Sequence, residues 1–242
     1  MDLEFLYILI FLLTVIQTIA GIGILVLGTP LLLILDVNFI KILGFLLPIS
    51  VFTSLLNILF FIFLEGSKFK INKNTKKIFF FITLPAVFLG LYLLKNFQEF
   101  INFKYFVSII ILISLILVFF KNFLIKIENK FKFMMLSFTG VIHGLSNSGG
   151  SLLSLLFSLI SNKNQSRYNI TYFYFFLAFF QYVLFIYLFG KNNFNHEFLI
   201  YILISIPGCL VGNYLIKYLN KKIFEFIIYF LALIGSISLI YS

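Results

Sequence analysis

Long apolar runs dominate this sequence and limit its fold more than any other feature. Only 11% of the 242 residues are charged, against roughly 25% in a soluble domain, so a soluble chain of this length would lack polar surface. Most runs are close to the roughly 20 residues that a membrane-spanning helix needs. We therefore predict an all-α polytopic membrane protein with about eight hydrophobic segments. They cover residues 3–35, 39–64, 78–94, 105–120, 133–160, 168–189, 198–216 and 223–241.

The positive charges lie between the apolar runs rather than in a basic domain of their own. The formal net charge is +10, yet the lysines are scattered through the short polar stretches, so we expect no nucleic-acid partner. Such lysines are typical of chain segments at the level of the lipid headgroups. Cys209 is the single cysteine, which excludes an internal disulfide and a cysteine-based metal site. We expect no metal ion and no cofactor, and the lipid bilayer as the surroundings.

Two distant segments of the chain match each other, which indicates an internal repeat. Residues 83–95 and 205–217 share a Pro, a Gly, a Tyr and a Lys at the same offsets. Asn57 and Gln181 correspond at a slightly different offset. The match predicts two homologous halves, residues 1–125 and 126–242, each a transmembrane repeat of four runs. Duplicated halves are common in transporters, whose binding site lies at the repeat interface.

The first run of each half is interrupted by glycines, and the charges favour a reversal of the chain at these breaks. If every run crosses the membrane once, the basic residues divide ten to eight between the two sides. If the runs over residues 3–35 and 133–160 are instead hairpins, the division is fourteen to four, with Arg167 among the fourteen. Cytoplasmic loops carry the excess of Lys and Arg. The hairpin arrangement predicts inverted halves, both termini outside, and breaks that meet near the membrane midplane to form a polar cavity.

The breaks themselves suggest a site for an anion. Glycine lets the backbone leave a helix and approach a ligand closely, and a helix that starts inside the membrane points free N–H groups at it. No Asp or Glu lies deep in any run, whereas a cation carrier would usually show one. The candidate substrate-binding residues are Gly21, Gly23, Thr29, Pro30, Asn57, His143, Gly144, Ser146, Asn147, Ser148, Gly149, Gly150 and Gln181.

Several of these residues also allow a purely structural interpretation. The glycines could simply permit close packing of helices. His143 could relay a proton or contact an anion, or it could be a neutral side chain that is hydrogen-bonded to the broken backbone. Asn57 and Gln181 could line the path, or they could join helices by hydrogen bonds. The sequence leaves these alternatives open.

The arrangement of motifs resembles the TauE/SafE family of sulfite exporters. The first break contributes Gly21, Gly23 and the run Pro30-Leu31-Leu32, and the second contributes Gly144, Gly149 and Gly150. The later elements Pro85/Gly90 and Pro207/Gly212 fit the same pattern. The sequence departs from it at Ile24-Leu25, where glycines are expected, and at Ser154-Leu155, which replaces the second Pro-Leu run. The resemblance covers nearly the whole chain and implies a transporter of two repeats.

We accordingly expect a secondary transporter of a small anion that works by alternating access. Sulfite or an organosulfonate is what the family resemblance implies. The expected location is the plasma membrane of a bacterial cell, and self-association into a homo-oligomer is left open. The alternative is a non-transport membrane subunit or an assembly factor of a larger complex. An intramembrane enzyme that uses His143 is disfavoured, because the sequence has no buried carboxylate pair, no nucleophile motif and no phosphate loop.

Overall fold

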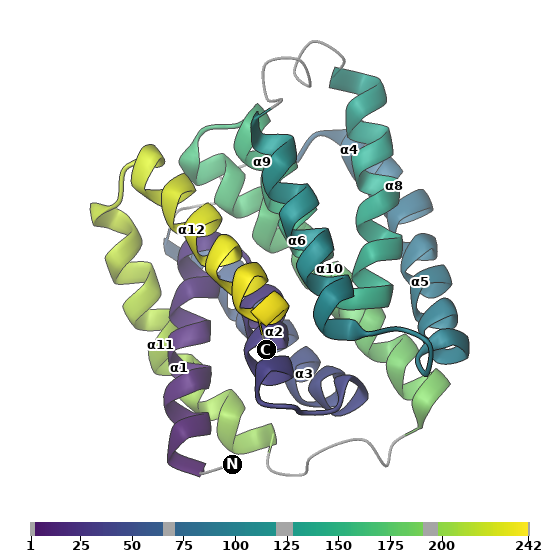
Figure 1. Ribbon diagram of the computed structural model, residues 1–242. Coiled ribbons are helices and arrows are strands. Elements are labelled where there is room, and N and C mark those ends of the chain that lie inside the picture. The colour runs from purple at the N-terminus through teal and green to yellow at the C-terminus, as the bar shows by residue number, and fades with distance from the viewer. Residues whose placement is uncertain (1–2, 65–70, 120–127, 191–197, 242) are drawn as a thin grey trace.

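The computed structural model describes residues 3–64, 71–119, 128–190 and 198–241, and this part of the chain is helical throughout, without strands (Figure 1). A π-helical turn at Phe79–Thr83 joins the helices Lys73–Ile78 and Leu84–Phe97 into one continuous helix, and a short 3-10 turn, Ile216–Tyr218, follows the helix Phe198–Leu215. The helices are α1 (Leu3–Ala20), α2 (Ile24–Ile34), α3 (Phe39–Leu64), α4 (Lys73–Ile78), α5 (Leu84–Phe97), α6 (Phe103–Phe119), α8 (Glu128–Ser146), α9 (Gly149–Ile160), α10 (Lys163–Phe189), α11 (Phe198–Leu215) and α12 (Lys221–Tyr241).

The all-α, multi-pass membrane character predicted from the sequence is confirmed. Five described helical stretches are long and apolar enough to cross a bilayer, and α2, α9 and the described part of α6 are shorter apolar helices. Eight crossing segments therefore remain a prediction. The five stretches are Leu3–Ala20, Phe39–Phe63, Lys73–Phe97, Lys163–Phe189 and Leu199–Tyr218.

Asparagines determine where several helices begin. An asparagine side-chain oxygen accepts hydrogen bonds from backbone N–H groups that have no partner inside the helix. Asn72 accepts from Asn74 and Thr75 at 2.9 and 3.1 Å, and Asn162 accepts from Gln165 at 3.0 Å. The same residue type precedes α3, α6 and α12, as Asn38, Asn102 and Asn220.

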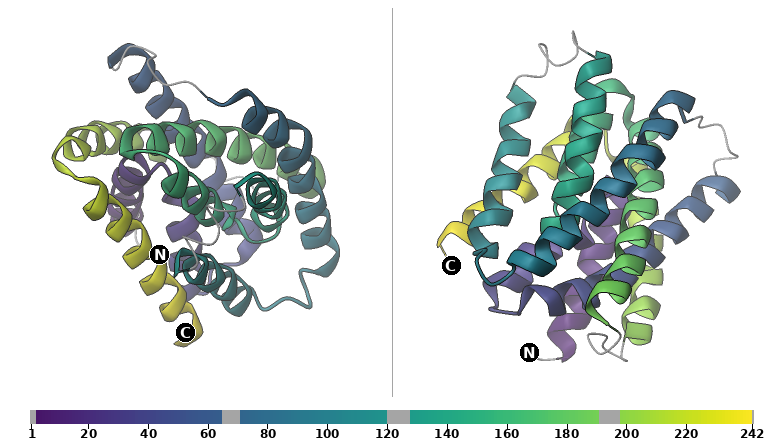
Figure 2. Two further views of the ribbon diagram at one scale, coloured as in Figure 1. Left: turned by 90° about the horizontal axis from the view of Figure 1, so that it is seen from above. Right: turned by 90° about the vertical axis from the view of Figure 1, so that its right-hand side faces the viewer.

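The chain reverses direction at both glycine-rich breaks. Gly23 lies so close to α1 that a Cβ atom there would be 2.7 Å from the backbone nitrogen of Gln17. A Cβ atom at Gly149 would be 2.6 Å from the His143 Cβ. α1 and α2 form the first hairpin, and α8 and α9 form the second. Figure 1 shows α1 rising from the N-terminus while α8 descends, and the right-hand view of Figure 2 shows the same opposition.

Each helix of one half packs against a helix of the other half. α1 packs against α11, α5 against α8, α3 against α10 and α6 against α12. Small residues permit the closest of these approaches. A Cβ atom at Gly90 in α5 would be 2.9 Å from the Gly144 Cα in α8, and one at Gly212 in α11 would be 2.6 Å from the Thr18 Cβ in α1. The two members of the Pro/Gly repeat motif therefore make equivalent contacts.

Many large apolar side chains point outward. Phe81 is 80% exposed, Leu203 64% and Ile8 61%. Exposed apolar surface of this extent is unfavourable in water but is the expected surface toward lipid chains. The buried core is also polar in places, with Gln17, His143 and Gln181 each almost fully buried. These polar residues gather where the hairpins meet.

Candidate functional site

The two breaks touch each other, as the sequence predicted. The Asn147 side chain in the second break donates from Nδ2 to the Thr29 hydroxyl in α2 at 2.9 Å. A Cβ atom at Gly150 would be 2.9 Å from a methyl group of Val26 and 3.3 Å from one of Ile22. The start of α9 is therefore packed directly against the first hairpin, and glycine at this position permits the approach.

The backbone follows the same course through both breaks. Gly21 has φ +79° and Asn147 has φ +64°, the left-handed conformation that Gly and Asn tolerate best. The Gly21 N–H donates to the Gln17 carbonyl at 2.8 Å, and the Asn147 N–H donates to the His143 carbonyl at 2.9 Å. Gln17 and His143 therefore occupy equivalent positions, four residues before the left-handed turn.

At the first break, the Gln17 side chain is fully engaged by its neighbours. Its Nε2 donates to the Ser50 carbonyl at 3.1 Å and to the Ser54 hydroxyl at 3.0 Å. Its Oε1 accepts from the Ile24 N–H at 3.1 Å, which caps α2, and from the Ser50 hydroxyl at 3.3 Å. Gln17 was not among the site residues predicted from the sequence. The signal was a lone amide in an apolar helix, four residues before a glycine.

At the second break, the equivalent position holds His143, whose side chain forms no hydrogen bond with the described residues. His143 is completely buried, and neither ring nitrogen has a hydrogen-bond partner among the described residues. Its ring centroid lies 5.8 Å from that of Tyr174, and its carbonyl accepts from Gln181 Nε2 at 3.0 Å. Three further buried atoms nearby also have no partner in the described part of the chain, namely Asn147 Oδ1, Tyr174 Oη and Gln181 Oε1.

Tyr174 lies between the starts of the two short helices. A Cβ atom at Gly150, in the first turn of α9, would be 2.7 Å from the Tyr174 Cε2. The Tyr174 hydroxyl faces the Ser50 side chain and the backbone of Leu25 in α2. Tyr174 was not predicted from the sequence, because one tyrosine in an aromatic-rich run has no distinguishing local pattern.

The serines of the second break direct their hydroxyl groups to the backbone. Ser146 donates to the Ile142 carbonyl at 2.8 Å, Ser148 to the Ser146 carbonyl at 3.1 Å and Ser151 to the Ser148 carbonyl at 2.7 Å. These hydrogens are thus engaged in this conformation, and a role as ligand donors remains a prediction for Ser146 and Ser148.

Two other predicted site residues have clear packing roles. Gly144 faces Gly90 and the backbone of Val87 in α5, so it serves the contact between α8 and α5. Pro30 is buried inside α2, one residue after Thr29. Whether either contacts a substrate stays a prediction.

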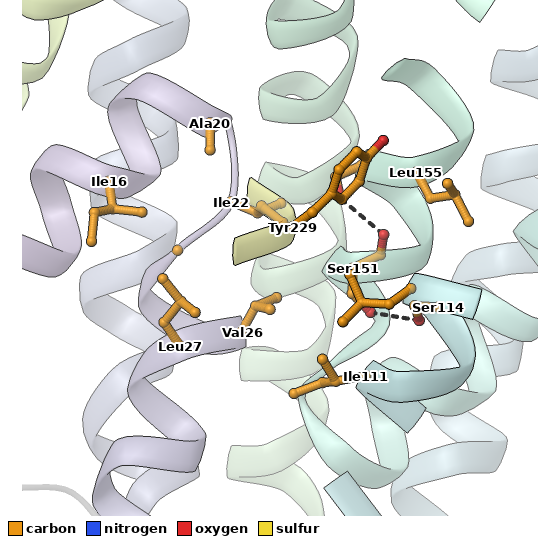
Figure 3. A pocket seen from close by; sticks show the side chains of 13 residues that line it. Ile16, Ala20, Ile22, Val26, Leu27, Ile111, Ser114, Ser151, Leu155 and Tyr229 are labelled. Atoms are coloured by element: carbon orange, nitrogen blue, oxygen red, sulfur yellow. Dashed lines mark hydrogen bonds between the residues drawn. The ribbon is translucent and has the colours of Figure 1, made fainter. Parts of the chain in front are cut away.

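A cavity does lie between the breaks, but it is mainly apolar, contrary to the polar cavity predicted (Figure 3). Its volume is about 30 Å³. Aliphatic side chains such as Ile16, Leu27 and Ile111 line most of it. Ser114 and Ser151, whose hydroxyls are 3.0 Å apart, supply polar groups. The described residues that line the cavity do not include His143, Asn147, Tyr174 or Gln181.

Arg167 is part of the interior, although its polar neighbours in the sequence predicted a loop charge. It lies in the second turn of α10, which begins at Lys163, ahead of the apolar run, and it is only 3% exposed. Its Nε donates to the Thr18 carbonyl near the end of α1 at 2.7 Å, and its Nη2 donates to Asn213 Oδ1 at 2.6 Å. A cation is favourable at this end of a helix. The guanidinium thus joins α1 to α10 and α11.

Asn57 and Gln181 both connect helices. Asn57 Nδ2 donates to the Thr18 hydroxyl at 3.1 Å, and Gln181 Nε2 donates to the His143 carbonyl. Each amide therefore ties the second long helix of its half to the first. No group of three or more His, Cys, Asp or Glu side chains that could hold a metal ion occurs in the described ranges.

Comparison with known proteins agrees with the motifs. The model of the sulfite exporter TauE/SafE family matches residues 6–239. No curated protein and no solved structure matches the chain. The match runs through both breaks and both Pro/Gly elements, and it covers nearly the whole sequence. The protein therefore belongs to the sulfite exporter TauE/SafE family of membrane transporters.

Proposed function

We propose that the protein is a secondary transporter of a small anion, sulfite or an organosulfonate, that works by alternating access around the paired breaks. One observation carries this proposal. Buried polar atoms of His143, Asn147 and Tyr174 lie beside the start of α9, and Gln181 lies against the His143 carbonyl; none of the described residues satisfies these atoms. A buried polar atom without a partner costs about 1–3 kcal/mol. A ligand that satisfies several of them would recover that cost.

The start of α9 favours an anion at this place. The first N–H groups of a helix have no partner within it, and the helix dipole adds positive potential there. The Ser148 side chain does not cap α9, whereas Gln17 caps the equivalent helix α2. The surrounding His143, Asn147 and Gln181 bring no carboxylate. The hydroxyl of Tyr174 and the imidazole of His143 can each donate a hydrogen bond to an oxyanion.

The fold supports inverted repeats, with residues 1–125 and 126–242 as the two halves. In this arrangement α1 corresponds to α8, α3 to α10, α5 to α11 and α6 to α12. If the halves are exchanged, the α1–α11 contact becomes the α8–α5 contact, and the α3–α10 and α6–α12 contacts remain the same pairs. The 11 residues of α2 and 12 of α9 correspond to about 16 and 18 Å, roughly half of the hydrocarbon core. Both breaks would then lie near the membrane midplane. Rocking of such halves about a fixed central site is a common basis of alternating access.

The small cavity between the breaks supports an occluded conformation in this scheme. A volume of about 30 Å³ holds on the order of one or two water molecules, which is too little for an oxyanion with four heavy atoms. Binding therefore requires the two hairpins to separate on one side. Asn147 and Thr29, which bridge the hairpins, are the contact that must break.

The charge pattern supports a plasma-membrane orientation with the lysine-rich loops inside and the termini outside. Without the buried Arg167, the division of basic residues becomes thirteen to four, which is still the bias that cytoplasmic loops show. Reporter fusions at Lys73 and Ser242 test it. We expect a cytoplasmic signal from the first and an external signal from the second, and a shared side would contradict the orientation.

Flux of anions into proteoliposomes tests the transport proposal. We expect saturable sulfite uptake that organosulfonates compete for and that choline, a cation, leaves unchanged. The same anions should raise the melting temperature of the purified protein. Protein-free liposomes are the control for leakage. If no anion of the panel is transported or stabilises the protein, the proposal is wrong.

A further inference from the structure

The side-chain amide of Gln181 is held in one orientation by the backbone of α8. Its Nε2 donates to the His143 carbonyl at 3.0 Å, and exchanging the amide nitrogen and oxygen would place two acceptors against each other. The buried Oε1 is thus the atom that remains, and no described residue donates to it. An amide oxygen only accepts hydrogen bonds, so whatever satisfies it must bring an N–H or O–H group.

The equivalent amide in the first half has no such free oxygen. Asn57 in α3 donates from Nδ2 to the Thr18 hydroxyl in α1 at 3.1 Å, so it ties two helices together as Gln181 does. Its Oδ1 accepts from Asn213 Nδ2 at 3.2 Å. Both amides connect helices, but only Gln181 keeps a buried acceptor. The function as a helix tie therefore does not explain the free Oε1.

Gln181 lies on the same side of α10 as the candidate anion site. It follows Tyr174 by seven residues, two helical turns, so both side chains point the same way. His143 contacts both, with its ring against the Tyr174 ring and its carbonyl against the Gln181 amide. An oxyanion that accepts hydrogen bonds from His143 and Tyr174 would be repelled by a nearby bare acceptor. A donor carried by the anion itself turns that repulsion into a hydrogen bond.

We infer that Gln181 makes the site select a monoanion that carries its own hydrogen-bond donor, such as hydrogensulfite or an amino- or hydroxyl-bearing sulfonate. Donor-free anions of the same shape are then the poorer ligands. This inference rests on the proposed function, because it concerns the substrate of the same site. It makes Gln181 a specificity-determining residue rather than a helix tie alone.

Sulfamate and methanesulfonate are the probes that test the inference. Both are compact sulfonate-type monoanions at neutral pH, and they differ in an amino group against a methyl group. We expect the purified wild-type protein to bind sulfamate more tightly, by roughly twofold to tenfold, the range for one neutral hydrogen bond. Dissociation constants from titration calorimetry, or from ligand-dependent melting temperatures, give this ratio directly.

Two variants assign the preference to one atom. Gln181→Met removes the acceptor at nearly the same volume. We expect the ratio of the two dissociation constants to fall clearly below the wild-type ratio, and Asn147 Oδ1 is the other buried amide oxygen without a described partner. Asn57→Leu removes the equivalent amide from the first half. Its ratio should stay at the wild-type value, even where the loss of a helix tie weakens both affinities.

The outcomes separate this inference from the proposed function. Equal wild-type affinity for the two probes overturns the inference and leaves anion transport standing, and so does a Gln181→Met variant that keeps the preference. Failure of every anion in the panel to bind would overturn the proposed function, and the inference with it. The ratio of the sulfamate and methanesulfonate dissociation constants is measured on the wild-type protein. It therefore tests the inference even if Gln181→Met does not fold.

Discussion

The two breaks have the same backbone course, but the side chains at the equivalent position differ in whether they form hydrogen bonds with the described residues. In the first, Gln17 forms four hydrogen bonds and caps α2. In the second, His143 stands at the equivalent position, and neither of its ring nitrogens has a partner in the described structure. The two breaks thus share a backbone course and differ in the side chain at the equivalent position. The difference supports the proposal that the first break is a structural element and that the second is the one available to a ligand.

The energies of the two arrangements differ in sign. A buried hydrogen bond contributes about 0.5–1.5 kcal/mol, whereas a buried polar atom without a partner costs about 1–3 kcal/mol. Gln17 therefore stabilises the first hairpin, while the polar atoms around His143 destabilise the second. Such a local cost is expected where a protein keeps groups ready for binding. Substitutions in equivalent positions can test this contrast directly.

The largest effect on stability should come from Gln17→Leu. It removes the cap of α2 and leaves the buried Ile24 N–H and the hydroxyls of Ser50 and Ser54 without their partner, so we expect a loss of about 2–5 kcal/mol. Thermal unfolding followed by circular dichroism measures it, since the chain has no Trp for fluorescence. An unchanged melting temperature would mean that the first break does not depend on this network.

The matched change in the second break, His143→Leu, should affect transport rather than stability. It removes two unpartnered nitrogens without breaking a described side-chain hydrogen bond, so the free energy of unfolding should change by about 1 kcal/mol or less. Sulfite flux in proteoliposomes should fall at least about tenfold, through loss of a charge-assisted hydrogen bond to the anion. A stability loss as large as that of Gln17→Leu would contradict the proposed difference between the breaks.

Tyr174→Phe should give a smaller change of the same kind. It removes only a buried hydroxyl, so we expect an unchanged melting temperature and an apparent dissociation constant for sulfite about twofold to tenfold higher. Tyr201→Phe is the matched control, because Tyr201 in α11 packs against Tyr7 and Phe45, away from the breaks. Equal effects of the two variants would remove Tyr174 from the site.

The sequence predicted the parts of the fold that depend on local pattern. Apolar runs of helical length identify membrane helices, and glycines within two of them marked where the chain reverses at Gly21 and Asn147. The contact between the breaks followed from the repeat. The mainly apolar cavity was not foreseen, because the pairing of side chains across helices decides which polar groups face one another.

The residues whose roles the sequence did not predict, or predicted differently, have one feature in common, which is that their contacts lie far away along the chain or depend on where a helix begins. Gln17 and Tyr174 are single polar residues in apolar runs. The serines that Gln17 binds, and the groups that the Tyr174 hydroxyl faces, lie more than 20 residues away along the chain. Arg167 was counted in a loop because its neighbours are polar, yet α10 begins four residues earlier. Gly144 matched the family motif, but it packs against Gly90. Only the tertiary contacts separate these roles.

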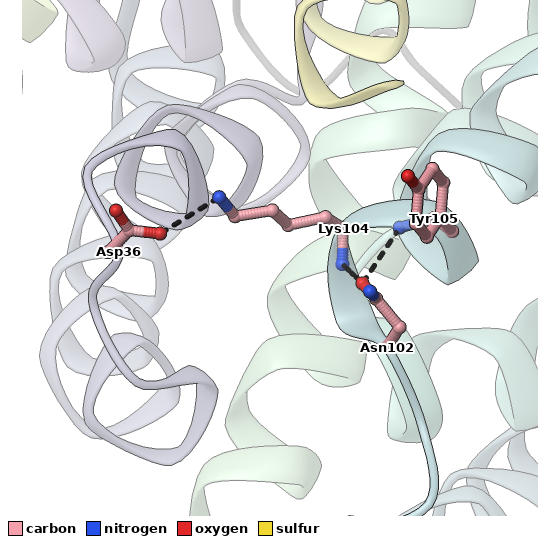
Figure 4. A network of polar contacts seen from close by, with 4 residues as sticks. All are labelled: Asp36, Asn102, Lys104 and Tyr105. Atoms are coloured by element: carbon pink, nitrogen blue, oxygen red, sulfur yellow. Dashed lines mark hydrogen bonds and ion pairs between the residues drawn. The ribbon is translucent and has the colours of Figure 1, made fainter. Parts of the chain in front are cut away.

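The smallest effect should come from the open end of the first hairpin. There, Asp36 forms an ion pair with Lys104 at 2.8 Å, beside Asn102, which caps α6 (Figure 4). The pair lies at the surface, with Asp36 84% exposed. Exposed ion pairs contribute little, because water screens them and two long side chains must be ordered. Asp36→Asn isolates the charge, since asparagine also tolerates the left-handed conformation, φ +55°, that this residue adopts.

We expect Asp36→Asn to change the free energy of unfolding by about 0.5 kcal/mol or less and sulfite flux by less than about twofold. Such a result would place the stability of the first hairpin in the Gln17 network, at its closed end. A loss comparable to that of Gln17→Leu would show instead that the open end holds the hairpin. Faster flux at unchanged stability would have a third meaning, because the ion pair would then restrain the separation of the hairpins during transport. Measuring both quantities on the same preparation, with Gln17→Leu alongside, distinguishes the three results.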